Sequence, residues 1–190
     1  MAPGSIILVF GVSGVGKTFS CEDFASRHPE WLYLRASALL AKVTKETPET
    51  LRTEAEDSIR SNQSLLGDAL RAARIGRVDR PVLLDAHAVI DNEKGLVEVP
   101  IQAVADLGGD AIILLEALAE DLAVRRLESI RRRPGRTIEQ LKLEIAAENR
   151  TVAAYARKLN IPLALAMVCE GFSLDPIIDE LAHLLARGAD

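Results

Sequence analysis

Residues 11–18 read Gly-Val-Ser-Gly-Val-Gly-Lys-Thr, and they directly follow the apolar run Ser5–Phe10. Two glycines separated by four residues and followed by Lys-Thr form the pattern of a loop that holds phosphate. Glycine lets the backbone curl so that successive N–H groups point at an anion, and a helix beginning at the lysine adds its positive end. Lys17 then reaches the β- and γ-phosphates, and the Thr18 hydroxyl binds Mg²⁺. The stretch therefore predicts a site for a nucleoside triphosphate with Mg²⁺.

The loop and the first turn of the following helix supply the expected nucleotide contacts. Because the phosphates lie against the loop backbone, these contacts include residues with small or apolar side chains. The expected residues are Gly11, Ser13, Gly14, Val15, Gly16, Lys17, Thr18 and Phe19.

Short apolar runs and longer helical patterns alternate along the rest of the chain. The apolar runs show no polar alternation, which is typical of parallel strands buried on both faces. This order predicts an α/β fold, the three-layer P-loop NTPase fold, with helices on both faces of one sheet. The expected strands are Ser5–Phe10, Trp31–Leu34, Pro81–Asp85, Ala111–Glu116 and Pro162–Val168. The expected helices are Lys17–Ser26, Ser37–Val43, Glu49–Ile75, Glu120–Arg131, Ile138–Leu159 and Asp175–Ala186.

Length and composition limit the classes of protein to consider. The 190 residues, 48% apolar and 27% charged, indicate a single folded domain over 1–190 rather than a disordered chain. A net charge of −5 argues against a partner that is nucleic acid or anionic membrane. The apolar runs are too short to span a membrane. Cys21 and Cys169 are too few for a zinc module and suit a reducing compartment, so we expect a cytoplasmic protein.

A second group of candidate residues lies where the expected strand Pro81–Asp85 ends. Asp85 is placed next to the phosphate loop, where a carboxylate can hold Mg²⁺ through water. The alternative role for Asp85 is that of a turn cap, because aspartate favours turns. His87 lies two residues further on, and the sequence leaves open whether it is catalytic or only packed.

Six arginines lie within twelve residues of an otherwise acidic chain. Pro134 and Gly135 break the helix among them, so several guanidinium groups belong to a short loop. Guanidinium groups bind phosphate oxygens in pairs and keep their charge, which favours a loop that closes over the transferring phosphates. The alternative is a solvated basic helix end. The six are Arg125, Arg126, Arg131, Arg132, Arg133 and Arg136, and Arg150 on the next helix can reach back to the same phosphates.

Three segments together resemble the archaeal-type adenylate kinases and the related nuclear adenylate kinases that also act as ATPases in ribosome assembly. They are residues 11–18, the segment Leu-Asp-Ala-His-Ala-Val-Ile at 84–90, and the segment Ile-Ile-Leu-Leu-Glu-Ala at 112–117. The resemblance covers most of the chain in the same order. It implies a nucleoside monophosphate kinase with five parallel strands in the order 2-3-1-4-5. The implied reaction transfers the γ-phosphoryl group from MgATP to AMP.

The resemblance also implies roles for parts of the chain. A segment at about 35–75, with Arg52 and Gln63, would bind the monophosphate, and residues 126–137 would form a short lid. Arg126 would lie at the hinge of this lid, beside the adenine. The candidate catalytic residues are Lys17, Arg133, Arg136, Arg150 and His87, and the candidate metal ligands are Thr18 and Asp85.

The chain departs from the family pattern on the acceptor side. Ala86 replaces the usual threonine between the aspartate and histidine, the turn at 95–100 is reduced, and residues 35–40 lack an expected acidic residue. Two alternatives therefore stay open. One is an ATPase switch or assembly factor in which His87 positions water, and the other is a P-loop kinase with a different small acceptor. Homo-oligomerisation is also left open.

Overall fold

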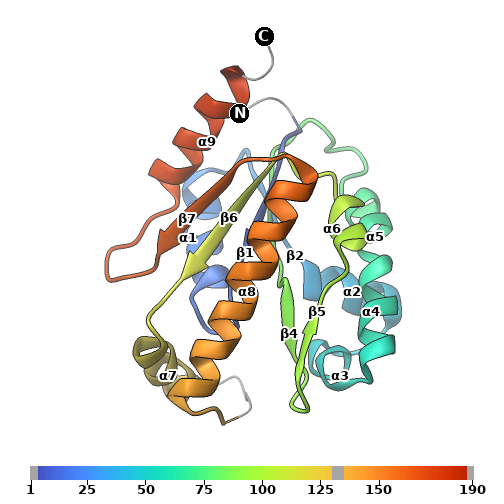
Figure 1. Cartoon of the computed structure of the whole chain (residues 1–190). Helices are drawn as coiled ribbons and strands as arrows, with labels where there is room; N and C mark the ends of the chain where they lie inside the picture. Colours follow the sequence, from blue (N-terminus) through green and yellow to red (C-terminus); the bar gives the residue numbers. More distant parts are fainter. Residues whose placement is uncertain (1–3, 130–134, 188–190) are drawn as a thin grey trace.

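A five-stranded parallel sheet forms the centre of the molecule (Figure 1). The computed structural model describes residues 4–129 and 135–187. The strand order is β2-β3-β1-β6-β7, with β1 in the middle and all five of its side chains buried. The strands are β1 (Ile6–Phe10), β2 (Leu32–Arg35), β3 (Val82–Asp85), β6 (Ala111–Glu116) and β7 (Leu163–Met167).

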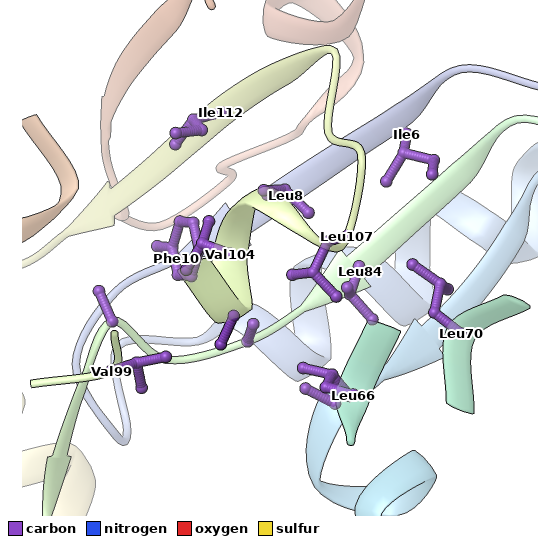
Figure 2. Close-up of a cluster of buried hydrophobic side chains, with 14 of the residues drawn as sticks. Ile6, Leu8, Phe10, Leu66, Leu70, Leu84, Val99, Val104, Leu107 and Ile112 are labelled. Carbon is purple, nitrogen blue, oxygen red and sulfur yellow. The ribbon is translucent and has the colours of Figure 1, made fainter. Parts of the chain in front are cut away.

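Helices cover both faces of this sheet and produce two apolar clusters. Side chains alternate along β1, so Leu8 and Phe10 join one cluster, whereas Ile7 and Val9 join the other. The first cluster contains side chains of α2, α5 and α6 and the C-terminal half of α8. Figure 2 shows Leu66 and Leu70 of α5 and Val104 of α6 within it. The second contains side chains of α1, α7 and α9. The helices are α1 (Lys17–Arg27), α2 (Ala36–Thr44), α3 (Pro48–Thr53), α4 (Glu56–Ser64), α5 (Leu66–Ala73), α6 (Ile101–Ala105), α7 (Ala119–Glu128), α8 (Ile138–Leu159) and α9 (Asp175–Arg187).

The predicted α/β class and the parallel sheet of five strands are confirmed, but the strand numbering differs. The structure contains an antiparallel hairpin, β4 (Val89–Asp91) and β5 (Leu96–Glu98), which the sequence analysis did not expect. The last two sheet strands are therefore the sixth and seventh along the chain, and the order is 2-3-1-6-7 instead of 2-3-1-4-5. Strands of three residues are too short to show a period-two pattern, which is why the hairpin was missed.

The single helix expected at Glu49–Ile75 is wrong, because three short helices occupy this region. The chain leaves the helical conformation at Glu54 and Ala55, whose backbones are extended, and α5 begins after Leu65. Neither glycine nor proline lies at these breaks, so the apolar spacing continues through them and predicts one helix. The breaks bend this segment around the end of the sheet next to the phosphate loop (Figure 1).

Helix α8 has the bounds that the sequence predicts. Thr137 accepts a hydrogen bond from the backbone N–H of Gln140, and the Gln140 side chain accepts one from the backbone N–H of Thr137. This capping box starts the helix, and Asn160 ends it in the left-handed conformation. Among the described residues no helix is both long enough and apolar enough to cross a membrane.

Candidate functional site

The phosphate loop connects β1 to α1, as the sequence predicts, and two glycines explain its shape. Gly11 has a φ of 144°, and a Cβ atom there would lie 2.5 Å from the carbonyl oxygen of Leu115. Gly16, with a φ of 117°, turns the chain into α1. Side chains at either position would be strained, so the loop needs glycine at both.

Lys17 lies inside the loop and beside the predicted histidine. Its side chain is buried, and its ammonium donates hydrogen bonds to the carbonyl oxygens of Gly11 and, at 3.3 Å, Val12. The Lys17 Nζ atom lies 3.4 Å from Nδ1 of His87. The structure therefore brings Lys17 and His87 together, although 70 positions separate them in the sequence.

Thr18 and Asp85 also meet, and their oxygens suit a magnesium ion. The Thr18 hydroxyl donates a hydrogen bond of 2.8 Å to Asp85, and the Tyr33 hydroxyl lies 3.4 Å from the same carboxylate oxygen. Burial and the Asp85 carboxylate raise the pKa of Tyr33, so this hydroxyl stays protonated and donates. Mg²⁺ bound with nucleotide needs only one or two protein oxygens besides the phosphates. The pair fits that requirement, and no cluster of three His, Cys, Asp or Glu ligands occurs in the described part of the chain.

One cavity of about 330 Å³ extends from the phosphate loop to the helices that follow β2. It brings together residues of the expected nucleotide site and of the expected monophosphate segment. Predicted residues that line it are Ser13, Gly14, Gly16, Lys17, Thr18, Phe19, Arg52, Gln63, Asp85, His87 and Arg126. The lining also includes Arg35 and Ser37, which belong to the expected monophosphate segment, and Asp91 and Glu144, which were not expected to bind a substrate.

Arg126 forms a buried ion pair at the loop side of this cavity. Its guanidinium donates to the carbonyl oxygen of Ser13 at 2.8 Å and to Oε1 of Glu144 at 2.6 Å. The two charged side chains are only 8% and 5% exposed. Arg125 holds the next part of the loop, because it donates to the carbonyl oxygen of Val15 at 2.9 Å. Helix α7 is thereby fixed against the phosphate loop.

Arg52 and Arg136 approach each other at the tip of the β4–β5 hairpin. Arg136 donates two hydrogen bonds to the Asp91 carboxylate, at 2.9 and 2.7 Å. Arg52 donates to the Asp91 backbone carbonyl at 2.7 Å and to the Glu93 carboxylate at 2.8 Å. Burial alone raises the pKa of Asp91, but hydrogen bonds from Arg136 and from the Glu93 backbone outweigh it and lower that pKa below 3.8. Asp91 is therefore an ionised carboxylate at the cavity wall.

Other predicted residues lie elsewhere. Gly11 and Val15 do not line the cavity; both are buried within the phosphate loop. Phe19 reaches the cavity mouth but is 76% exposed. Arg150 is an exposed side chain that pairs with Glu98 at 3.3 Å. Arg131, Arg132 and Arg133 belong to residues 130–134 of the predicted lid, which lie outside the described residues.

Glu148 on α8 was missed by the sequence analysis. It is completely buried and accepts hydrogen bonds from the backbone N–H groups of Gly11, Ala88 and Val89. A signal for it was present, because Glu148 lies in line with the buried apolar residues Leu141 and Val152 of the same helix. A glutamate in such a stripe indicates a buried polar contact.

Comparisons with known proteins agree with this fold. The sequence profile of the AAA domain family matches residues 10–142. Adenylate kinase from Pyrococcus abyssi is 29% identical over 108 residues, 56% of this chain and 55% of that protein, so the match spans about half of the relative. Adenylate kinase from Pyrococcus horikoshii is 25% identical over 95% of this chain and 94% of its own. Shikimate kinase from Bacteroides thetaiotaomicron superimposes with a TM-score of 0.58 at 15% identity, covering 96% of this chain and 98% of its own.

The family match extends over more than half of the chain, from the end of β1 into α8. Because the shikimate kinase is only 15% identical in sequence, its similarity supports the fold alone. With its phosphate loop at the centre of a parallel sheet, the chain belongs to the AAA domain family and has the α/β fold of the P-loop kinases.

Proposed function

We propose that the chain is a nucleotide kinase of the adenylate kinase type, which transfers the γ-phosphoryl group of MgATP to AMP. The observation that carries this proposal is the single cavity that joins the phosphate loop to the segment after β2. A kinase needs donor and acceptor in one enclosed space, whereas a hydrolase needs only the donor and water. The similarity to two Pyrococcus adenylate kinases supports the same assignment.

The donor half consists of the phosphate loop, Lys17, Thr18 and Asp85. Backbone N–H groups and the start of α1 bind the phosphates, and Lys17 neutralises the β- and γ-phosphate charge. Thr18 and Asp85 would hold Mg²⁺, which lowers the negative charge of the phosphates when it is bound. Arg126, fixed against Ser13, borders this half.

The acceptor half lies between α2, α3 and the β4–β5 hairpin. Arg35, Arg52 and Gln63 line it and supply donors for a phosphate and a base. An oxygen of the acceptor phosphate would attack the γ-phosphorus, and the bond from that phosphorus to the β–γ bridging oxygen would break, giving two ADP. Such a transfer depends mainly on positioning and on charge stabilisation.

Two arginines already have carboxylate partners that a substrate phosphate would replace. Arg52 binds Glu49 and Glu93, and Arg136 binds Asp91. Residues 126–137 would act as the lid that carries Arg136 and Arg133 towards the phosphates. This exchange keeps each guanidinium paired with an anion before and during the reaction.

A substitution on the acceptor side tests the proposal. Arg52→Ala should raise KM for AMP at least about tenfold and leave KM for ATP within about twofold, because Arg52 lies at the acceptor end of the cavity. Arg60→Ala is the matched control, since Arg60 belongs to the same segment but forms an exposed pair with Glu56. Equal effects of Arg52→Ala on both substrates would contradict the assigned halves.

One observation favours a second candidate, ATP hydrolysis without an acceptor. His87 Nδ1 lies 3.4 Å from Lys17 Nζ at the cavity wall, where an imidazole can orient water beside the γ-phosphate. This candidate predicts phosphate release from MgATP that AMP does not change and that His87→Ala abolishes. The first candidate predicts ADP formation that requires AMP.

A further inference from the structure

Glu148 is a buried carboxylate that none of the proposed steps uses. It lies on α8 with no exposed surface. Its Oε1 atom accepts hydrogen bonds from the backbone N–H groups of Gly11, at 2.9 Å, and Ala88, at 3.1 Å. Its Oε2 atom accepts a third from Val89 at 2.7 Å. Three backbone groups from two distant segments therefore share one side chain.

These two segments carry the residues assigned to the donor half. Gly11 opens the phosphate loop, and Ala88 and Val89 directly follow the Asp85–His87 stretch. The backbone ladder between β1 and β3 ends with the bond from Ala86 N–H to the Val9 carbonyl, at 3.0 Å. Beyond that bond the Glu148 carboxylate bridges the two segments. The carboxylate therefore connects the two segments at the point where the hydrogen bonds of the sheet end.

A carboxylate suits this place better than any other side chain. The N–H groups of Gly11, Ala88 and Val89 are buried, and a buried N–H without an acceptor is costly. A carboxylate offers two acceptor oxygens, whereas an amide offers one oxygen and one N–H₂ donor. Glutamine in place of Glu148 would therefore turn a donor towards at least one of the three N–H groups.

We propose that Glu148 is a positioning residue, which sets the spacing between Lys17 in the phosphate loop and two residues of the other segment, Asp85 at the end of β3 and His87 just beyond it. This inference rests on the proposed MgATP site and not on the identity of the acceptor. The loop amides bind the phosphates in ground and transition states alike, whereas transfer needs both segments at the right separation. Loss of Glu148 should therefore reduce kcat more than it weakens ATP binding.

The test compares Glu148→Gln with Glu139→Gln, which changes an exposed glutamate on the same helix. A displacement of about 1 Å between reacting groups can cost about 100-fold in rate, so we expect kcat of Glu148→Gln to fall about 10- to 100-fold. Binding of ATP, measured by calorimetry without AMP, should stay within about twofold of wild type. Glu139→Gln should match wild type in both measurements.

Two results would overturn the proposal. One is a folded Glu148→Gln protein with unchanged kcat, and the other is a loss of ATP affinity as large as the loss of kcat. If wild type transfers nothing to AMP, the proposed function fails, and the hydrogen-exchange measurement still tests whether Glu148 joins the two segments.

Amide hydrogen exchange of the wild-type protein needs no variant to fold. If Glu148 ties the segments, the N–H groups of Gly11 and Val89 should open together and show protection factors within about tenfold of each other. Protection of one and rapid exchange of the other would show that no common contact holds them, and would contradict the inference.

Discussion

Replacing Arg126 by methionine removes the guanidinium from a buried ion pair and keeps an unbranched side chain next to the phosphate loop. Arg126 donates to Glu144 at 2.6 Å and to the Ser13 carbonyl at 2.8 Å. The second carboxylate oxygen of Glu144 is buried and has no hydrogen-bond partner among the described residues. The substitution therefore leaves a buried carboxylate without its cation.

The exposure of the two side chains decides how much free energy of unfolding the protein should lose. Exposed ion pairs contribute about 0–1 kcal/mol, whereas removing one partner of a buried pair costs about 3–5 kcal/mol. Side chains that are 8% and 5% exposed place this pair in the second class. For a domain of this size each kcal/mol lowers Tm by about 2–4 °C, so Arg126→Met should lower Tm by about 6–20 °C.

Thermal and urea unfolding followed by circular dichroism measure this loss, with Arg60→Met as the control. Arg60 forms an exposed ion pair with Glu56, so removing this pair should lower the free energy of unfolding by at most about 1 kcal/mol. The double variant Arg126→Met/Glu144→Leu should regain most of the stability, because apolar residues can replace a buried pair. If Arg126→Met lowers the free energy of unfolding by less than about 1 kcal/mol, or if the double variant recovers no stability, Arg126 and Glu144 do not act as a buried ion pair.

Three further predictions concern pH, turnover and thiol reactivity. Because Arg136 lowers the pKa of Asp91 below 3.8, the pair stabilises the fold above that pH and is lost as the pH falls through the lower, folded value. The Tm difference between wild type and Asp91→Asn should thus be constant near pH 7 and shrink below about pH 4; a constant difference down to pH 3 would contradict it. Lys17→Ala should abolish ADP formation while the circular dichroism spectrum stays native. A folded variant with wild-type turnover would contradict the role of Lys17 in neutralising the phosphates. Cys169 is exposed, whereas burial raises the pKa of Cys21, so a thiol reagent should modify Cys169 rapidly and Cys21 only after unfolding; rapid modification of both in the folded protein would contradict this.

Local sequence rules predicted the parts of the fold that local chemistry controls. Residues 11–18 predict the loop because glycine and lysine are needed at fixed positions, and the structure places that loop between β1 and α1. The bounds of α8 follow from helical spacing, and local contacts agree with them, because Thr137 and Gln140 cap the start of the helix and Asn160 ends it. The buried strands follow from uninterrupted apolar runs.

Local sequence patterns do not predict contacts between segments that are far apart in the sequence. Asp91 lies in a strand of three residues, and only the folded chain shows that Arg136, 45 positions away, binds its carboxylate. Arg52 was predicted from a resemblance, yet its bonds to the β4–β5 hairpin could not be predicted because the hairpin itself was missed. The contacts of Glu148 join three backbone groups that only the tertiary fold brings together.

Product analysis with MgATP alone, and then with AMP, CMP, UMP, GMP or dTMP in turn, tests the proposed function most directly. We expect rapid ADP formation that requires AMP and yields two ADP for each AMP consumed. ADP formation that requires another acceptor would keep the kinase and replace AMP. Phosphate release at the same rate with and without every acceptor would contradict the kinase assignment.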